Sequence, residues 1–295
     1  MIHAVLTYLT CPICGLSLTV GTGQVRCPDG HAYDLARGGH LTLTTGRAAE
    51  VAGDHAEMVR SREAFLAGGH YAALADQLGA VIRNYTIKNG AIGGEQVFVD
   101  VGAGPGYYLA HLLNLCPSAV GIALDVSRQA LRRAARAHPR IGAVGVDLRG
   151  PLPVRTGTAS VVLDVFAPRN VTEMHRILRP DGHLVIVTPT VRHLAGLVDS
   201  LGLVTVDERK PERLRSKLAG SFVQRDQWTL DLDLSLTAQD LLHLVMMGPT
   251  AHHRRAADIQ LLIEERWPAG AASTASFMIE LYEPYGTRSR KEAVP

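Results

Sequence analysis

The sequence predicts an α/β fold in which a mainly parallel sheet is covered by helices on both faces and preceded by a small metal-binding module. From residue 96 onward, short apolar strands alternate with helices, and this is the pattern of consecutive βαβ units. Before residue 46, three cysteines and a histidine occur among closely spaced glycines and prolines. That second pattern is typical of small β-hairpins built around a metal ion.

Composition excludes several classes of protein. The chain has 295 residues, enough for about two domains. Its 46% hydrophobic and 20% charged residues predict a sizeable core and exclude a disordered protein. The net charge of +2 is too small to indicate nucleic-acid binding. Only four of the 30 Lys and Arg residues are lysines, and we attribute this bias to genomic base composition.

Cysteine chemistry depends on the compartment. No run of 18 apolar residues indicates a membrane span, and the N-terminus lacks the layout of an export signal. We therefore expect a cytoplasmic protein without a membrane partner. Clustered cysteines in that compartment favour metal binding over disulfides.

Residues 1–45 are expected to form a zinc-binding module for RNA recognition. The spacing C-x2-C-x12-C-x3-H places two thiolates on one tight turn and two further ligands across a hairpin. All four ligands would be protein groups, so the zinc would be structural. A set of buried free thiols is the alternative, and Cys116, which stands alone, is expected to be such a core residue. The predicted ligands are Cys11, Cys14, Cys27 and His31.

Residues 46–94 are expected to form a helical connector. One helix is predicted over residues 57–66 and ends at Gly68-Gly69. A second is predicted over residues 71–87, where apolar side chains recur at helical spacing, and it ends at Asn89-Gly90.

Residues 95–295 carry the alternating pattern of the larger domain. Five parallel strands are predicted at residues 96–101, 120–125, 143–147, 159–166 and 183–188. Helices are predicted at residues 107–115, 127–137, 170–178, 191–201 and 238–247, with Ser127, Asn170 and Thr237 as N-caps. Two closing strands at residues 228–236 and 273–282 would complete a seven-stranded sheet.

A glycine-rich turn after the first of these strands marks the candidate ligand pocket. Gly102, Gly104 and Gly106 follow Asp100, and Tyr107 stands where the dinucleotide-binding fingerprint G-x-G-x-x-G would have its last glycine. Acids follow the next two strands, at Asp125 and Asp147, and the carboxyl ends of such strands line ligand sites.

This arrangement favours S-adenosylmethionine, with its methionine end on the glycine turn and its ribose hydroxyls on Asp125. Asp147 would lie near the adenine amino group. The pattern thus predicts a Rossmann-like class I methyltransferase fold; an NAD- or FAD-binding Rossmann unit stays open as the alternative.

The end of the fourth strand would face the reacting methyl group. There Phe166 is a candidate wall for the target base and Asp164 a candidate proton acceptor, although an inert strand-end carboxylate is the preferred interpretation of Asp164.

Several segments together resemble the 23S ribosomal RNA guanine-N1-methyltransferase family. They are residues 11–34, 57–71 and 99–108, Phe166-Ala167-Pro168-Arg169-Asn170, residues 178–182, and Thr188-Pro189 with His193-Leu194. The aromatic-Ala-Pro segment resembles especially the macrolide-resistance branch, which methylates a guanine in a hairpin lining the peptide exit tunnel.

The resemblance implies S-adenosylmethionine and zinc as cofactors and 23S rRNA as the partner, and a homodimer is compatible with it. It also implies cofactor contacts from Tyr71, the Gly106-Tyr107 turn and His193. Two rival functions stay open: an S-adenosylmethionine-dependent methyltransferase of small molecules with a structural zinc knuckle, and a non-enzymatic RNA-binding regulator.

Overall fold

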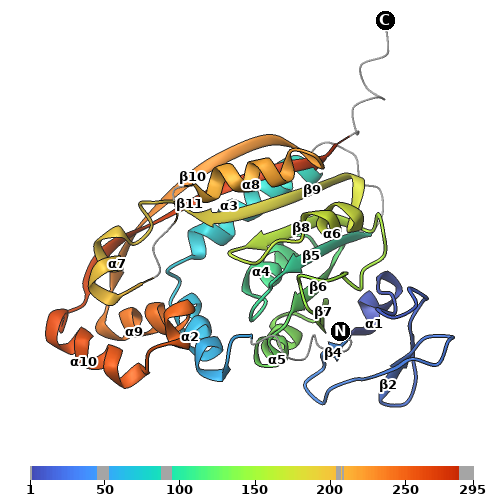
Figure 1. Ribbon diagram of the computed structural model, residues 1–295, viewed down its shortest axis with the longest axis horizontal. Coiled ribbons are helices and arrows are strands. Elements are labelled where there is room, and N and C mark those ends of the chain that lie inside the picture. The colour runs from blue at the N-terminus through green and yellow to red at the C-terminus, as the bar shows by residue number, and fades with distance from the viewer. Residues whose placement is uncertain (1, 45–52, 88–94, 204–206, 208, 286–295) are drawn as a thin grey trace, which may run out of the picture.

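A computed structural model describes residues 2–44, 53–87, 95–203, 207 and 209–285 (Figure 1). Within these residues, the main sheet has eight strands in the order β10-β11-β9-β8-β5-β6-β7-β4. Strands β4 to β9 are parallel, and β11 and β10 extend the sheet in antiparallel fashion. Their bounds are β4 (Leu41–Thr42), β5 (Gln96–Val101), β6 (Ala119–Asp125), β7 (Ile141–Gly145), β8 (Ala159–Val165), β9 (Leu178–Pro189), β10 (Phe222–Leu236) and β11 (Ala271–Pro284).

Two hydrophobic cores lie on opposite faces of this sheet, because residues along a strand point alternately to either side. In β5, Phe98 belongs to one core while Val97 and Val99 belong to the other. Helices that contribute to the Phe98 face are α2 (Ala56–Ala67), α3 (Ala72–Ile82), α4 (Tyr107–Leu115), α5 (Arg128–Ala137), α7 (Ala195–Leu201), α9 (Ala238–Met246) and α10 (Ala256–Arg266). Helices on the Val97 face are α1 (Ile2–Val5), α6 (Val171–Ile177) and α8 (Lys210–Leu218). The predicted α/β class is therefore confirmed.

The N-terminal module adds a strand to the main sheet. Its own antiparallel sheet consists of β1 (Thr19–Val20), β2 (Gln24–Arg26) and β3 (Ala32–Asp34), and a short 3-10 helix, η1 (Leu6–Tyr8), follows α1. The next strand, β4, pairs in parallel with β7, which gives eight strands where the sequence predicts seven. Helix α1 packs so closely on β7 that a Cβ at Gly142 would lie 2.0 Å from Val5 Cγ2. Only glycine fits there.

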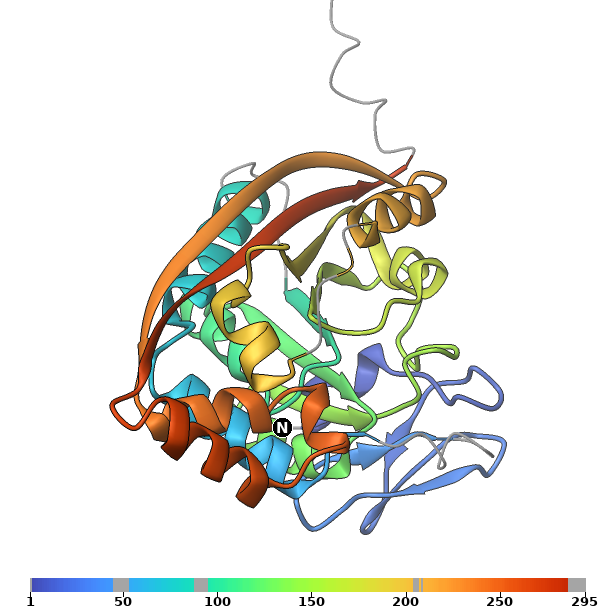
Figure 2. The same ribbon diagram turned by 60° about the vertical axis from the view of Figure 1, so that its left-hand side comes forward.

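The C-terminal segment builds a cap beside the carboxyl ends of the parallel strands. Figure 2 shows the long, curved hairpin of β10 and β11, with α9 and α10 next to α2. A 3-10 helix, η4 (Pro249–His252), joins these two helices, and a π-helical turn, η3 (Arg83–Ile87), extends α3. The predicted cap at Thr237 is confirmed, since its hydroxyl and the Asp240 side chain form a capping box.

Some predicted boundaries were wrong. Strand β7 ends at Gly145, so Asp147 lies in the following loop rather than at the strand end. Strand β9 already begins at Leu178, where it pairs with Ala159, instead of after a turn at Pro180–Gly182. Helices α8 and α10 were not predicted, because α8 is almost entirely polar and α10 has only a weak apolar face.

The predicted domain boundaries after residues 45 and 94, and the helix end at Asn89-Gly90, lie outside the described residues. Among the helices that the structure describes, none has both the length and the apolar character that a membrane span needs.

Candidate cofactor pocket and metal centre

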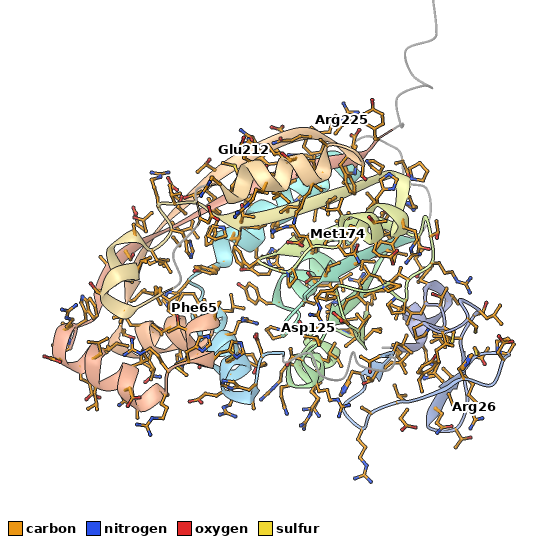
Figure 3. All side chains as sticks on the ribbon, viewed as in Figure 1. Arg26, Phe65, Asp125, Met174, Glu212 and Arg225 are labelled. Carbon is orange, nitrogen blue, oxygen red and sulfur yellow. The ribbon has the colours of Figure 1, made fainter. Side chains whose placement is uncertain are left out.

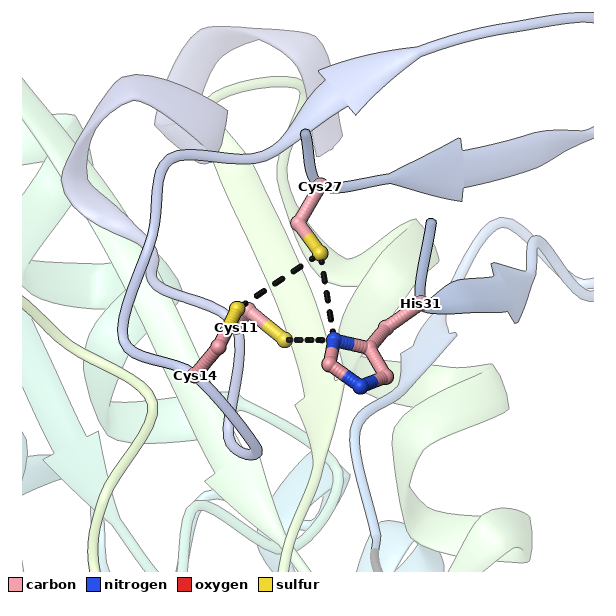
Figure 4. A group of neighbouring side chains, drawn as sticks. All are labelled: Cys11, Cys14, Cys27 and His31. Atoms are coloured by element: carbon pink, nitrogen blue, oxygen red, sulfur yellow. Dashed lines mark hydrogen bonds between the residues drawn. The ribbon is translucent and has the colours of Figure 1, made fainter. Parts of the chain in front are cut away.

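The four predicted zinc ligands converge at one end of the N-terminal module (Figure 4). The ligand atoms all lie within 4.8 Å of one another. Cys14 Sγ is 3.6 Å from Cys27 Sγ, and His31 Nδ1 is 3.3 Å from Cys27 Sγ and 3.6 Å from Cys11 Sγ. The edges of a zinc tetrahedron with Zn–S of about 2.3 Å and Zn–N of about 2.0 Å are about 3.5 to 3.8 Å long. These residues therefore fit a tetrahedral Zn²⁺ held entirely by protein ligands.

Two tight turns present the ligands. The amide of Gly15 donates to the Cys11 carbonyl at 2.8 Å, and the amide of Gly30 donates to the Cys27 carbonyl at 3.0 Å. The Tyr33 hydroxyl lies 2.9 Å from Cys11 Sγ and can donate to that thiolate, which is the usual role of a residue behind a metal ligand. Cys116 is buried elsewhere in the core, as predicted.

The glycine turn and Asp125 are joined by direct hydrogen bonds. Asp125 ends β6 and accepts the amide of Gly104 at 2.8 Å through Oδ2 and the amide of Ser127 at 2.8 Å through Oδ1. Burial raises the pKa of Asp125, and these two amide donors act against that rise. Each oxygen keeps a lone pair, so the carboxylate is oriented to accept further donors. Figure 3 shows Asp125 in the interior, between the sheet and the helices around α2.

Asp100 lies on the same face of the sheet and lacks a partner. It is 2% exposed, and within the described residues no side chain or amide forms a hydrogen bond or an ion pair with its carboxylate. Burial, reinforced by the charges of Asp125 and Asp164, raises the pKa of Asp100 to about 8. A buried carboxyl group without a donor is costly, so this position fits a ligand that brings a cation or an N–H group.

Two residues that the sequence analysis did not single out lie beside the predicted pocket: Asp54, in the loop before α2, and Arg62, in α2 itself. Arg62 of α2 forms an ion pair with Asp54, and its Nη2 donates to the carbonyl of Met247 at 2.7 Å. A Cβ at Gly104 would lie 3.4 Å from Nη1 of Arg62, so the guanidinium lies over the glycine turn. No sequence motif marks Arg62, because its position depends on how α2 packs against α9 and α5.

The remaining glycines have packing roles as well. A Cβ at Gly102 would lie 2.4 Å from the Cβ of Ala167, so the glycine turn touches the loop after β8. A Cβ at Gly106 would lie 3.1 Å from the Cα of Ala134, which lets α4 begin against α5. Tyr107, the first residue of α4, is partly buried and lies edge-on to Tyr108.

Phe277 of β11 is the centre of an aromatic cluster at the carboxyl edge of the sheet. Its ring centroid lies 5.0 Å from that of Tyr71, 4.9 Å from that of His193 and 5.5 Å from that of Phe166. The structure therefore brings together three predicted site residues from distant parts of the chain. Phe277 was predicted only as part of a strand, since nothing local distinguishes it from a core residue.

His193 is neutral, and its hydrogen bond fixes the tautomer. The amide of Ser276 donates to Nδ1 of His193 at 3.2 Å, which leaves the proton on Nε2. Burial lowers the pKa of His193 to about 4, so the ring carries no charge near neutral pH. This side chain thus offers one N–H donor within the aromatic cluster.

Phe166 and Asp164 have different surroundings although they are two residues apart. Phe166 is 44% exposed and has a φ of 59°, a strained conformation for a side chain of this size. Such strain often marks a functional position. Asp164 is fully buried on the opposite face of the sheet, where Nη2 of Arg169 lies 3.0 Å from its Oδ1.

Asp147 is already engaged by its neighbour. Arg149 reaches both carboxylate oxygens, at 3.0 Å through Nε and 2.9 Å through Nη2, and this pair lowers the pKa of Asp147. The structure therefore does not leave Asp147 in the same unpartnered state as Asp100.

Comparison with known proteins divides the chain into two matched segments. The N-terminal zinc ribbon of RlmA matches residues 9–44. A methyltransferase domain matches residues 98–182, the segment that contains the glycine turn, Asp125 and Phe166. Zinc and S-adenosylmethionine are the cofactors that these two segments take, as predicted.

Three relatives match along most of the chain. A protein of Micromonospora griseorubida, provisionally named a 23S rRNA (guanine-N(1)-)-methyltransferase, is 47% identical over 84% of this chain and 88% of its own. The 23S rRNA (guanine(748)-N(1))-methyltransferase of Streptomyces fradiae is 41% identical over 88% of this chain and 91% of its own. A Bacillus subtilis protein, YxjB, with the same provisional name as the first, is 28% identical over 86% of this chain and 90% of its own. The chain therefore belongs to the 23S rRNA (guanine-N1)-methyltransferase family.

Proposed function

We propose that this chain transfers the methyl group of S-adenosylmethionine to N1 of a guanine in the 23S rRNA hairpin that lines the peptide exit tunnel, and so lowers sensitivity to macrolides. The observation that supports this most is the buried Asp100 and Asp125 pair beside the glycine turn, which faces the aromatic cluster around Phe277. The name of the Streptomyces fradiae relative specifies guanine 748, and we propose the corresponding guanine as the target.

Each residue of the pocket would bind a different group of the cofactor. Asp125, oriented by the amides of Gly104 and Ser127, would accept the ribose hydroxyls. Asp100, buried without a donor, would accept the ammonium group, and Arg62 would contact the carboxylate over the glycine turn. Asp147 stays the predicted neighbour of the adenine amino group. When bound, S-adenosylmethionine supplies a methyl group activated by the positive charge on sulfur.

The aromatic cluster would hold the guanine. Tyr71, His193 and Phe277 make a largely apolar surface, and Phe166 exposes its ring at the edge of that surface. A base that is methylated on its pairing edge has to leave its stack, which costs less in a loop than in a duplex. Phe166 would stack on the flipped base and hold N1 in line with the methyl group, and alignment is the largest contribution that the protein can make.

The proton on guanine N1 would leave without a carboxylate base. Asp164 points to the other face of the sheet and is paired with Arg169. Asp125 is occupied by two amides and the proposed ribose contact. Solvent at the open edge beside Phe166 is the proton acceptor that we propose.

We propose the same organisation as the sequence predicts: a zinc module at residues 1–45 that recognises RNA, a helical connector at residues 46–94, and a methyltransferase domain at residues 95–295. The test is methyl transfer in vitro from labelled S-adenosylmethionine to a transcript of the 23S hairpin, followed by mass spectrometry of the RNA. We expect one N1-methylguanine per hairpin, lost when the target guanine is replaced. Turnover without incorporation into RNA would instead favour a small-molecule substrate.

A further inference from the structure

We infer that one side of helix α5, together with the loop between β3 and β4, is the surface that contacts the phosphates of the RNA substrate. This surface, called here the arginine stripe, consists of Arg37, Arg128, Arg132 and Arg136. The inference rests on the proposed function and adds to it the place where the RNA lies.

The four arginines of α5 fall on two sides of the helix. Arg128, Arg132 and Arg136 are each four residues apart and exposed, so they form one row along the helix. Arg133 lies on the other side of the exposed face, toward α2, where Glu63 pairs with it at 3.3 Å. α5 contains no acidic residue. The row of three therefore keeps its full positive charge.

The row faces the N-terminal module. A Cβ at Gly38 would lie 3.0 Å from Cγ of Arg132, so the stem of Arg132 rests on the loop between β3 and β4. The exposed Arg37 precedes Gly38 in that loop. Across the described residues, none of the four arginines of the stripe forms an ion pair with a carboxylate. Because these arginines have no carboxylate partner within the described residues, they are available to bind an anion from outside, such as a phosphate.

The arginine charges at this join also act on a neighbouring side chain. Burial of His40, which follows the same loop, lowers its pKa, and the charges of Arg132 and Arg128 lower it further. Figure 1 shows α5 beside β4, with the zinc module on the other side of β4. The stripe thus runs from the zinc module to Arg128, which directly follows the Ser127 cap at the pocket.

RNA is the partner that this geometry fits. Successive arginines of the row are about 6 Å apart along the helix axis, close to the distance between neighbouring phosphates of one strand. Arginine binds phosphate bidentately, and such contacts position a nucleic acid without reading its sequence. A hairpin held along the stripe would extend from the zinc module toward the pocket, where the guanine is flipped.

The test uses the full-length, zinc-loaded chain and a fluorescent transcript of the 23S hairpin. Arg132→Gln/Arg136→Gln removes two charges from the stripe, and Arg128 is left intact because it borders the pocket. Arg215→Gln/Lys217→Gln is the matched control, because it removes two exposed charges from α8, which packs on the other face of the sheet. Binding is measured by anisotropy over a range of salt concentrations, and zinc content and S-adenosylmethionine affinity report folding.

We expect the stripe variant to bind the hairpin about fivefold more weakly and its salt dependence to fall by about 1.5 in slope, at roughly 0.7 to 0.9 per lost phosphate contact. Its KM for RNA should rise while its kcat and its S-adenosylmethionine affinity stay unchanged. Arg132→Lys/Arg136→Lys should restore the slope.

A stripe variant that binds RNA with the affinity and slope of the α8 control would overturn the inference, while methylation by the wild-type chain in the same assay would leave the proposed function intact. A wild-type chain that methylates no RNA would overturn both. If the double variant does not fold, Arg37→Gln, a substitution in a loop, is compared with the α8 control in the same way. The salt dependence of its RNA binding should fall by about half as much, because one phosphate contact is lost instead of two.

Discussion

At the scale of single residues, the unpartnered carboxyl group of Asp100 gives the most specific prediction about the pocket, a release of protons when the cofactor binds. Its raised pKa of about 8 means that the cofactor-free chain keeps a proton on Asp100 at neutral pH. A bound ammonium group would favour the charged form and lower that pKa. Binding of S-adenosylmethionine at pH 7 should therefore release up to one proton from Asp100.

Calorimetry in two buffers of different ionisation enthalpy measures that proton. Asp100→Asn is the control, because its amide cannot titrate. Equal proton release by the wild type and by Asp100→Asn would contradict the assignment. The sign for stability is opposite to that of an ordinary ion-paired acid: between the usual carboxyl pKa and about 8 the folded chain binds the extra proton, so the free energy of unfolding falls as pH rises.

A second prediction at this scale concerns Arg62, which only the tertiary structure places beside the glycine turn. Arg62→Gln removes the guanidinium over the glycine turn and should weaken S-adenosylmethionine binding by about tenfold or more, because hydrogen bonds to charged groups contribute about 1.5–3 kcal/mol. Arg60→Gln, an exposed position on the same helix, should bind normally. If both variants bind alike in calorimetry, Arg62 does not touch the cofactor.

Phe166 and Asp164 separate alignment from proton transfer. Phe166→Ala should slow single-turnover methyl transfer by about 100-fold, since a misplacement of about 1 Å has that cost. Asp164→Asn should slow it by less than about tenfold, below the 10²–10⁴ range of a general base. It should lower the free energy of unfolding by about 3 kcal/mol, because Arg169 loses a buried partner. A 100-fold loss of rate in a folded Asp164→Asn variant would make Asp164 the base.

At the scale of elements, the zinc module tests whether metal and methyl transfer are coupled. Cys14→Ser removes one of four ligands, and a module this small has little core of its own, so zinc binding and its local folding should be lost together. Metal analysis should find no zinc in Cys14→Ser and one zinc in the control Cys116→Ser. Methylation of RNA should fall with the zinc, while S-adenosylmethionine binding persists.

Elements were predicted well where the pattern is local and poorly where it is not. The helix at residues 107–115 and the caps at Ser127 and Thr237 follow from sequence, because capping and apolar spacing act within one turn. The pairing of β4 with β7 could not be foreseen, since two residues carry no periodicity. Helix α8 has the same difficulty: among its residues whose burial the structure describes, two are buried, Leu214 and Leu218.

At the scale of the whole molecule, the sequence predicts the site residues that belong to local motifs but not those that packing between distant elements brings in. The structure brings the four zinc ligands together, joins Asp125 to the glycine turn and places Tyr71 beside His193, while the cofactor contacts of these residues stay predictions. The zinc ligands, the glycine turn and Asp125 were found from spacing, and Tyr71 and His193 from the resemblance. Phe277 and Arg62 were not, because each is defined by packing between elements far apart in the chain.

At this scale, we propose that a zinc-containing methyltransferase modifies N1 of one tunnel-lining guanine. Reverse transcription of 23S rRNA from macrolide-sensitive cells expressing this chain tests that claim most directly, because a methyl group on N1 blocks base pairing. We predict that reverse transcription stops beside the guanine equivalent to guanine 748, the target in the name of the Streptomyces fradiae relative. Cells that express Asp125→Ala should show no such stop. Full-length transcripts through that hairpin from cells that contain the folded wild-type chain would contradict it.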